Sequence, residues 1–134
     1  MIGLDKAQEI NDMLNEINEK NDMDATIKNF NKYHYYILQA IDYLENKFFQ
    51  EAESNIMKAI SINYHAPEAH NLLGALSELN GELGYAGRHY LAANALDPTY
   101  LPAIRNLRRL TTYSFRKKPI KPDLGNNNTN FDMD

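Results

Sequence analysis

Glycines recur in the segment GALSELNGELGYAG, which covers residues 74–87. Gly81, Gly84 and Gly87 have the spacing G-x-x-G-x-x-G, which is similar to that of loops that bind phosphate through backbone N–H groups. Such a loop needs a strand before it and the N-terminus of a helix after it. Here an apolar helical pattern comes before the glycines, and no Lys-Ser or Lys-Thr pair follows them. The spacing therefore predicts no phosphate site, and Gly81 is expected to form a turn between two helices.

The remaining chemistry-bearing side chains also lack the spacing of a catalytic or metal site. His34, His65, His70 and His89 form neither an i, i+4 histidine pair nor a Glu-x-x-His motif. The chain has no cysteine, which removes disulfides, thiolate zinc sites and cysteine nucleophiles. No nucleophile turn and no pair of carboxylates stands out. We therefore expect no catalytic residue, no metal and no cofactor, and a protein that is not an enzyme.

Length and composition predict one ordinary globular domain. The chain has 134 residues, of which 43% are hydrophobic and 24% are charged. It has no apolar run of the roughly 18 residues that a membrane span needs. The N-terminus carries acidic residues early and does not resemble a secretory signal. These features predict a cytoplasmic protein without a membrane partner.

The net charge of −4 is unevenly distributed. Residues 1–97 contain 15 acidic and 7 basic residues, whereas residues 98–134 contain 3 acidic and 7 basic ones. Such a split can mark an interaction surface for an acidic peptide or for nucleic acid, although a run of charges is more often a solvated face. Because the isoelectric point is about 5.5, nucleic acid is the weaker hypothesis. The basic residues of this part are Arg105, Arg108, Arg109, Arg116, Lys117, Lys118 and Lys121.

The chain is similar to itself after a shift of 34 residues. Ala52 then falls on Ala86 and Ala59 on Ala93, while Ala40 falls on another small residue, Gly74. Apolar residues within each period recur at spacings of three and four, which predicts two helices per period. Proline in a first turn and Asn-Gly or Asp-Pro after a last turn mark the helix ends. The predicted helices cover residues 34–46, 48–62, 67–79, 83–96 and 101–115.

A helix-turn-helix unit of 34 residues with this pattern resembles the tetratricopeptide repeat. The first unit, residues 33–66, departs from the family at Ala40, Lys47 and Tyr64, and the third unit has only its first helix. The resemblance covers residues 33–115 and implies an all-α helix-turn-helix solenoid of about two and a half repeats with flanking capping helices. The second unit carries the family pattern at His70, Leu73, Gly74, Gly81, Ala86, Tyr90, Ala93, Asp97 and Pro98.

The resemblance also implies a concave groove formed by the first helix of each pair. Some proteins of the family clamp a peptide carboxylate there with Lys, Asn and Arg, but only Asn106 is polar among the corresponding positions in this chain. We expect instead that Asn71, Arg105 and Arg109 favour an acidic segment. The mapped groove residues are His34, Ile37, Ile41, Asn71, Ala75, Glu78, Arg105 and Arg109.

Both ends of the chain flank the predicted repeat domain, residues 25–115. Residues 1–24 form a predicted amphipathic helix and linker, whose apolar stripe of Ala7, Ile10, Leu14 and Ile17 suits either a cap on the repeats or a homodimer. Residues 116–134 are expected to be a flexible tail.

The last predicted helix should cap the repeats. We expect its Arg105, Arg108 and Arg109 to point outward and its Leu107 and Leu110 to point inward.

These features favour a non-catalytic adaptor that binds a partner protein or peptide in the groove. The alternative is a self-associating structural subunit that assembles through the N-terminal helix or the ends of the solenoid. An enzyme ranks third, and an ordered cofactor or metal in the purified protein would revive that hypothesis. The sequence does not identify the partner, the oligomeric state or the role of Gly84 and Gly87.

Overall fold

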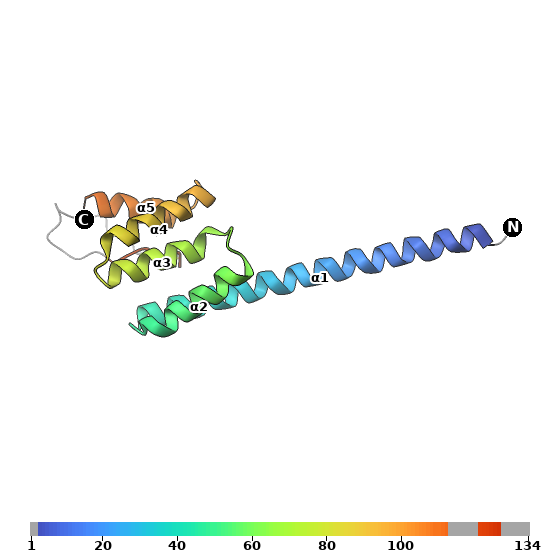
Figure 1. Ribbon diagram of the computed structural model, residues 1–134, viewed down its shortest axis with the longest axis horizontal. Coiled ribbons are helices and arrows are strands. Elements are labelled where there is room, and N and C mark those ends of the chain that lie inside the picture. The colour runs from blue at the N-terminus through green and yellow to red at the C-terminus, as the bar shows by residue number, and fades with distance from the viewer. Residues whose placement is uncertain (1–2, 113–120, 127–134) are drawn as a thin grey trace. The chain divides into compact units, whose positions relative to one another are not determined.

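The computed structural model describes residues 3–112 and 121–126, and within them all regular secondary structure is α-helical (Figure 1). The helices lie between Gly3 and Thr111, while residues 121–126 are not helical. The all-α expectation is confirmed, and α3 and α4 begin and end where the sequence pattern placed them. The helices are α1 (Gly3–Glu45), α2 (Phe49–Ile62), α3 (Pro67–Leu79), α4 (Leu83–Leu96) and α5 (Leu101–Thr111).

The chain forms two compact units, Met1–Lys32 and Tyr33–Asp134, and α1 contributes to both. The linker that the sequence predicts within residues 1–24 is helical, because α1 runs without a break from Gly3 to Glu45. Residues 4–45 contain no glycine or proline to interrupt the helix. The helix therefore continues through the division between the two units, which lies between Lys32 and Tyr33.

The core of the second unit joins the last turns of α1 to α2 and α3. Several of its residues are alanines, so the helix backbones approach closely while Ile and Leu fill the space between them. The phenol of Tyr33 donates a hydrogen bond to Glu68 (3.0 Å) and accepts one from the N–H of Ala69 (3.3 Å). Buried members of the core are Tyr33, Ile37, Ala40, Ile41, Leu44, Ala52, Ile56, Ala59, Ala69, Leu72, Ala75 and Leu76.

Helix α4 packs against both α3 and α5, and Gly74 of α3 leaves room for the ring of Tyr90 of α4. A Cβ atom at Gly74 would overlap the ring of Tyr90, which is completely buried. Ala86 and Ala93 of α4 are also completely buried. Small residues at these three positions therefore let the helices pack closely.

The turns between the helices repeat at an interval of 34 residues. Gly81, with φ of 79°, lies in the turn between α3 and α4, as predicted. Lys47 occupies the corresponding turn between α1 and α2 and adopts φ of 64°, although its side chain disfavours that conformation. The turn geometry is thus the same in both places while the residue type differs.

The two glycines inside α4 do not provide a tight contact. A Cβ atom at Gly84 would meet nothing within 4 Å, and one at Gly87 would lie 4.0 Å from Cδ1 of Leu110 in α5. The surface of α4 is therefore open to solvent space at Gly84 and in ordinary van der Waals contact with α5 at Gly87. None of the helices in the described part of the chain is both long enough and apolar enough to cross a membrane.

Candidate functional site

Two buried asparagines, Asn71 of α3 and Asn106 of α5, form the centre of the candidate site. Both are completely buried, and Nδ2 of Asn106 donates a hydrogen bond to Oδ1 of Asn71 (2.9 Å). Each asparagine follows four residues after a first-turn proline, Pro67 or Pro102, so both take the same place one turn into their helices. Buried amides need further partners, because an unpaired one costs about 1–3 kcal/mol.

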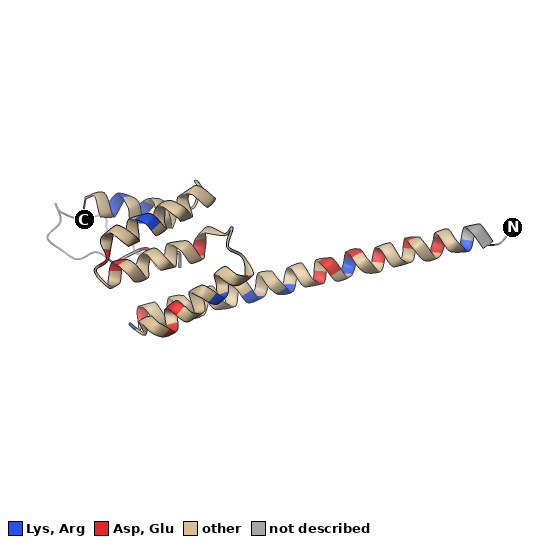
Figure 2. Ribbon diagram, in the orientation of Figure 1, with Lys and Arg blue, Asp and Glu red and all other residues tan. Residues whose placement is uncertain are grey.

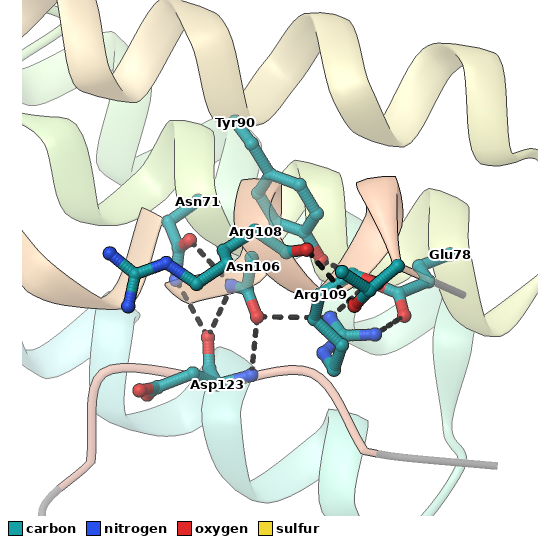
Figure 3. A network of polar contacts seen from close by, with 8 residues as sticks. Asn71, Glu78, Tyr90, Asn106, Arg108, Arg109 and Asp123 are labelled. Atoms are coloured by element: carbon teal, nitrogen blue, oxygen red, sulfur yellow. Dashed lines mark hydrogen bonds and ion pairs between the residues drawn. The ribbon is translucent and has the colours of Figure 1, made fainter. Parts of the chain in front are cut away.

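The segment of residues 121–126 supplies those partners (Figure 3). Nδ2 of Asn71 and Nδ2 of Asn106 each donate a hydrogen bond to the carbonyl oxygen of Asp123, both at 2.9 Å. The N–H of Asp123 donates in return to Oδ1 of Asn106 (2.7 Å). The two asparagines therefore bind both polar groups of one residue's backbone, which does not depend on the type of that residue.

The carboxylate of Asp123 has partners of its own. Nη1 of Arg105 lies 3.3 Å from its Oδ2, and the N–H of Gly125 donates a hydrogen bond to its Oδ1 (2.9 Å). The Asp123 side chain is 9% exposed, while that of Arg105 is 37% exposed, so water screens this ion pair in part. The site thus favours an acidic residue at this position.

The two residues after Asp123 are held by shape. Leu124 packs against the apolar core of the second unit. Gly125 has φ of 82°, and a Cβ atom there would overlap the hydroxyl of Tyr100. Burial, followed by the negative charges of Glu68 and Asp123, raises the pKa of Tyr100 above its ordinary value, so the hydroxyl stays protonated. Only glycine fits this position without strain.

A buried ion pair between Arg109 and Glu78 lies next to Asn106. Nη1 and Nη2 of Arg109 both donate hydrogen bonds to Glu78, the bond from Nη2 at 2.6 Å, and Nη2 also donates to Oδ1 of Asn106 (3.0 Å). The phenol of Tyr90 donates to Oε1 of Glu78 (2.7 Å). Burial acts to lower the pKa of Arg109, but the hydrogen bonds and charge of Glu78 outweigh it and raise that pKa. In residues 6–112 and 121–126, no buried side-chain polar atom lacks a partner.

Four of the predicted groove residues come together in this network, namely Asn71, Glu78, Arg105 and Arg109. His34 is half-buried on α1, where its ring centroid lies 5.8 Å from that of Tyr33. The other three, Ile37, Ile41 and Ala75, are buried in the apolar core.

Two sequence expectations need correction here. Arg109 does not point outward, because its side chain is 8% exposed and pairs with Glu78, while Leu107 and Leu110 are only half-buried. The expected flexible tail at 116–134 is packed against the helices at residues 121–126, and its other residues lie outside the described part of the chain.

Sequence reasoning missed the contributions of Tyr90, Asp123 and Gly125, and it considered Asn106 only as a carboxylate clamp. The shared Pro-x-x-x-Asn spacing of α3 and α5 could have indicated the asparagine pair. Within the residues described, no three His, Asp or Glu side chains gather where they could hold a metal ion. No family model matches the chain, and comparisons with curated proteins and with solved structures find no similar protein.

Proposed function

We propose that this protein is a non-catalytic adaptor that binds an extended acidic segment of a partner protein. The observation that carries the proposal is the pair Asn71 and Asn106, whose amides bind both backbone groups of Asp123 in the segment 121–126. Backbone binding of this kind gives affinity without demanding a particular sequence, and neighbouring side chains then add specificity. Arg105 adds a preference for a carboxylate at the bound residue.

The proposal includes a small tetratricopeptide-like solenoid as the scaffold of this groove. Its support is the 34-residue recurrence of the left-handed turns at Lys47 and Gly81 and the close contact of Gly74 with Tyr90. In such a scaffold the first helices of successive pairs lie next to each other, which explains why α3 and α5 present asparagines to the same segment.

Because residues 121–126 already bind Asn106, the test starts from Leu124→Ser, which removes the apolar anchor of that segment. In this background, replacing Asn106 by alanine should weaken peptide binding by about tenfold or more, because two hydrogen bonds worth about 0.5–1.5 kcal/mol each are lost. Random ten-residue peptides displayed on phage are selected on the full Leu124→Ser chain, and the affinity of the selected peptides is measured by fluorescence anisotropy. Asn55→Ala on α2 is the matched control, since Asn55 bonds only to Glu51 of its own helix among the contacts described.

A second substitution guards against misfolding of the Asn106 variant. In the same Leu124→Ser background, Arg105→Glu reverses a charge on a side chain that is 37% exposed, and it should weaken acidic peptides selectively while circular dichroism stays unchanged. Selected peptides that bind both variants as tightly as the Leu124→Ser parent would place their site elsewhere and contradict the proposal.

One observation favours a second function, self-association through residues 6–32. Figure 2 shows that acidic and basic residues alternate with uncharged ones along this part of α1. Residues 9–24 carry six acidic side chains and one lysine, whereas Lys28 and Lys32 follow without an acid. An antiparallel second copy would bring those lysines opposite Glu9 and Asp12 of the first. Side chains more than half exposed on this part are Ile10, Met13, Leu14, Ile17, Met23, Ile27 and Phe30.

Leu14→Glu should raise the dimer dissociation constant about tenfold or more, because a leucine buried in an interface contributes about 1.5–3 kcal/mol. Sedimentation equilibrium over a range of concentrations measures this constant. Asn15→Glu adds the same charge at the neighbouring exposed position and serves as the control. A wild-type protein that stays monomeric at every concentration excludes self-association.

A further inference from the structure

The proposed groove is already occupied by the chain's own residues 121–126, and this occupant reveals what the groove selects. A different feature of the groove contacts each of three consecutive residues, Asp123, Leu124 and Gly125. The amides of Asn71 and Asn106 bind the backbone of Asp123, while Arg105 faces its carboxylate. Leu124 packs against the apolar core. Gly125 lies beside the hydroxyl of Tyr100, where a Cβ atom would not fit.

We infer that the partner carries an aspartate-aliphatic-glycine segment that bends at the glycine, and that residues 121–126 occupy the groove until this segment binds. This inference rests on the proposed peptide-binding function and names the ligand of the same site. A segment with this chemistry reproduces the contacts of Asp123, Leu124 and Gly125, so partner and tail exclude each other.

The contacts of the tail suit an occupant that can be displaced. Arg105 and Gly125 stay open to water. Outside the asparagine pair, the segment has two further described hydrogen bonds to helices: Nη1 of Arg105 donates to Asp123 (3.3 Å), and Nδ2 of Asn126 donates to Glu45 (2.6 Å). A tethered segment competes through its local concentration, which reaches the millimolar range for short linkers. The apparent affinity of a partner then falls in proportion to the fraction of open grooves.

The partner is a different protein and not a second copy of this chain. A second copy would offer the same residues 121–126 that already fill the groove within one chain. Exchanging the tails would form identical contacts and free no groove, so it provides no driving force for association. A different protein gains affinity from residues on either side of the shared segment.

Gly125→Ala is the variant that opens the groove without changing any groove side chain. The added Cβ atom would overlap the hydroxyl of Tyr100, and the positive φ disfavours alanine in any case. Gly84→Ala is the matched control, because its Cβ atom would meet nothing within 4 Å. Leu124→Ser is a second opening variant, which removes the apolar anchor instead and serves if Gly125→Ala fails to fold.

The probe is a fluorescein-labelled peptide KPDLGN, the sequence of residues 121–126, with both ends capped. Fluorescence anisotropy should show that it binds Gly125→Ala and Leu124→Ser at least about tenfold more tightly than the wild type or Gly84→Ala, since an open groove raises the competent fraction. Probes with Asp or Gly changed to Ala should each bind the opened protein about tenfold more weakly than KPDLGN.

The outcomes separate this inference from the groove proposal. Equal binding of KPDLGN to wild type and both opened variants overturns the competition by the tail, and equal binding of the altered probes overturns the proposed signature. If phage-selected peptides depend on Asn106 while KPDLGN does not bind the opened protein, the inference fails and groove binding stands. A concentration-dependent dimer that Leu124→Ser abolishes would assign the segment to a second copy instead.

Discussion

Replacing Arg109 by methionine should lower the free energy of unfolding by about 3–5 kcal/mol, because it leaves a buried carboxylate without its countercharge. Arg109 and Glu78 have side chains that are 8% and 7% exposed, so water cannot replace the lost guanidinium. Tyr90 would still donate one hydrogen bond to Glu78, which offsets only part of the loss. Urea unfolding followed by far-ultraviolet circular dichroism measures the change.

The neighbouring residue and a double variant test the cause of this loss. Arg108→Met removes an equal charge from an exposed position of the same turn and should change stability by less than about 0.5 kcal/mol. Glu78→Met combined with Arg109→Met should cost clearly less than the sum of the two single changes, because neither charge is left alone. A loss below about 1 kcal/mol for Arg109→Met alone would contradict a buried, uncompensated carboxylate.

The helices of the second unit follow from local signals in the sequence. Pro67 suits a first turn, where its missing N–H is not needed, and the apolar spacing after it covers all of α3. Gly81 suits a turn that requires a positive φ. Such signals act within a few residues of one another, so one sequence is sufficient to locate them. The polar residues at 21–24 favour a linker, but no glycine or proline interrupts the chain there, and the helix continues.

The parts of the site that sequence reasoning missed depend on distant contacts. Arg109 belongs to the charged side of a short helix by its periodicity, and only Glu78, 31 residues earlier, makes its burial favourable. Asp123 and Gly125 stand in a stretch with two prolines and few apolar residues, which is typical of a flexible tail. Their segment is held in place by Asn71 and Asn106, and no local sequence pattern indicates this distant contact.

Gly74→Ala should destabilise the protein by about 1–3 kcal/mol, although alanine is the better helix former, because the added methyl group overlaps the ring of Tyr90. The ring cannot move aside freely, since its phenol donates a hydrogen bond to the buried Glu78. Gly87→Ala is the matched control in α4, where a Cβ atom would lie 4.0 Å from Leu110. There the gain in helix propensity, about 1 kcal/mol, should appear without opposition. Thermal and urea unfolding of the two variants should therefore shift in opposite directions.

The effect of Gly74→Ala should change sign when Tyr90 is shortened. In a Tyr90→Leu background the overlap is removed, and the same substitution should then stabilise α3 by up to about 1 kcal/mol. The double-mutant cycle isolates the steric contact from the helix propensity, which is the same in both backgrounds. A destabilisation that persists at full size in the Tyr90→Leu protein would contradict the overlap as its cause. The glycine inside α3 would then need another explanation than the close approach of α4.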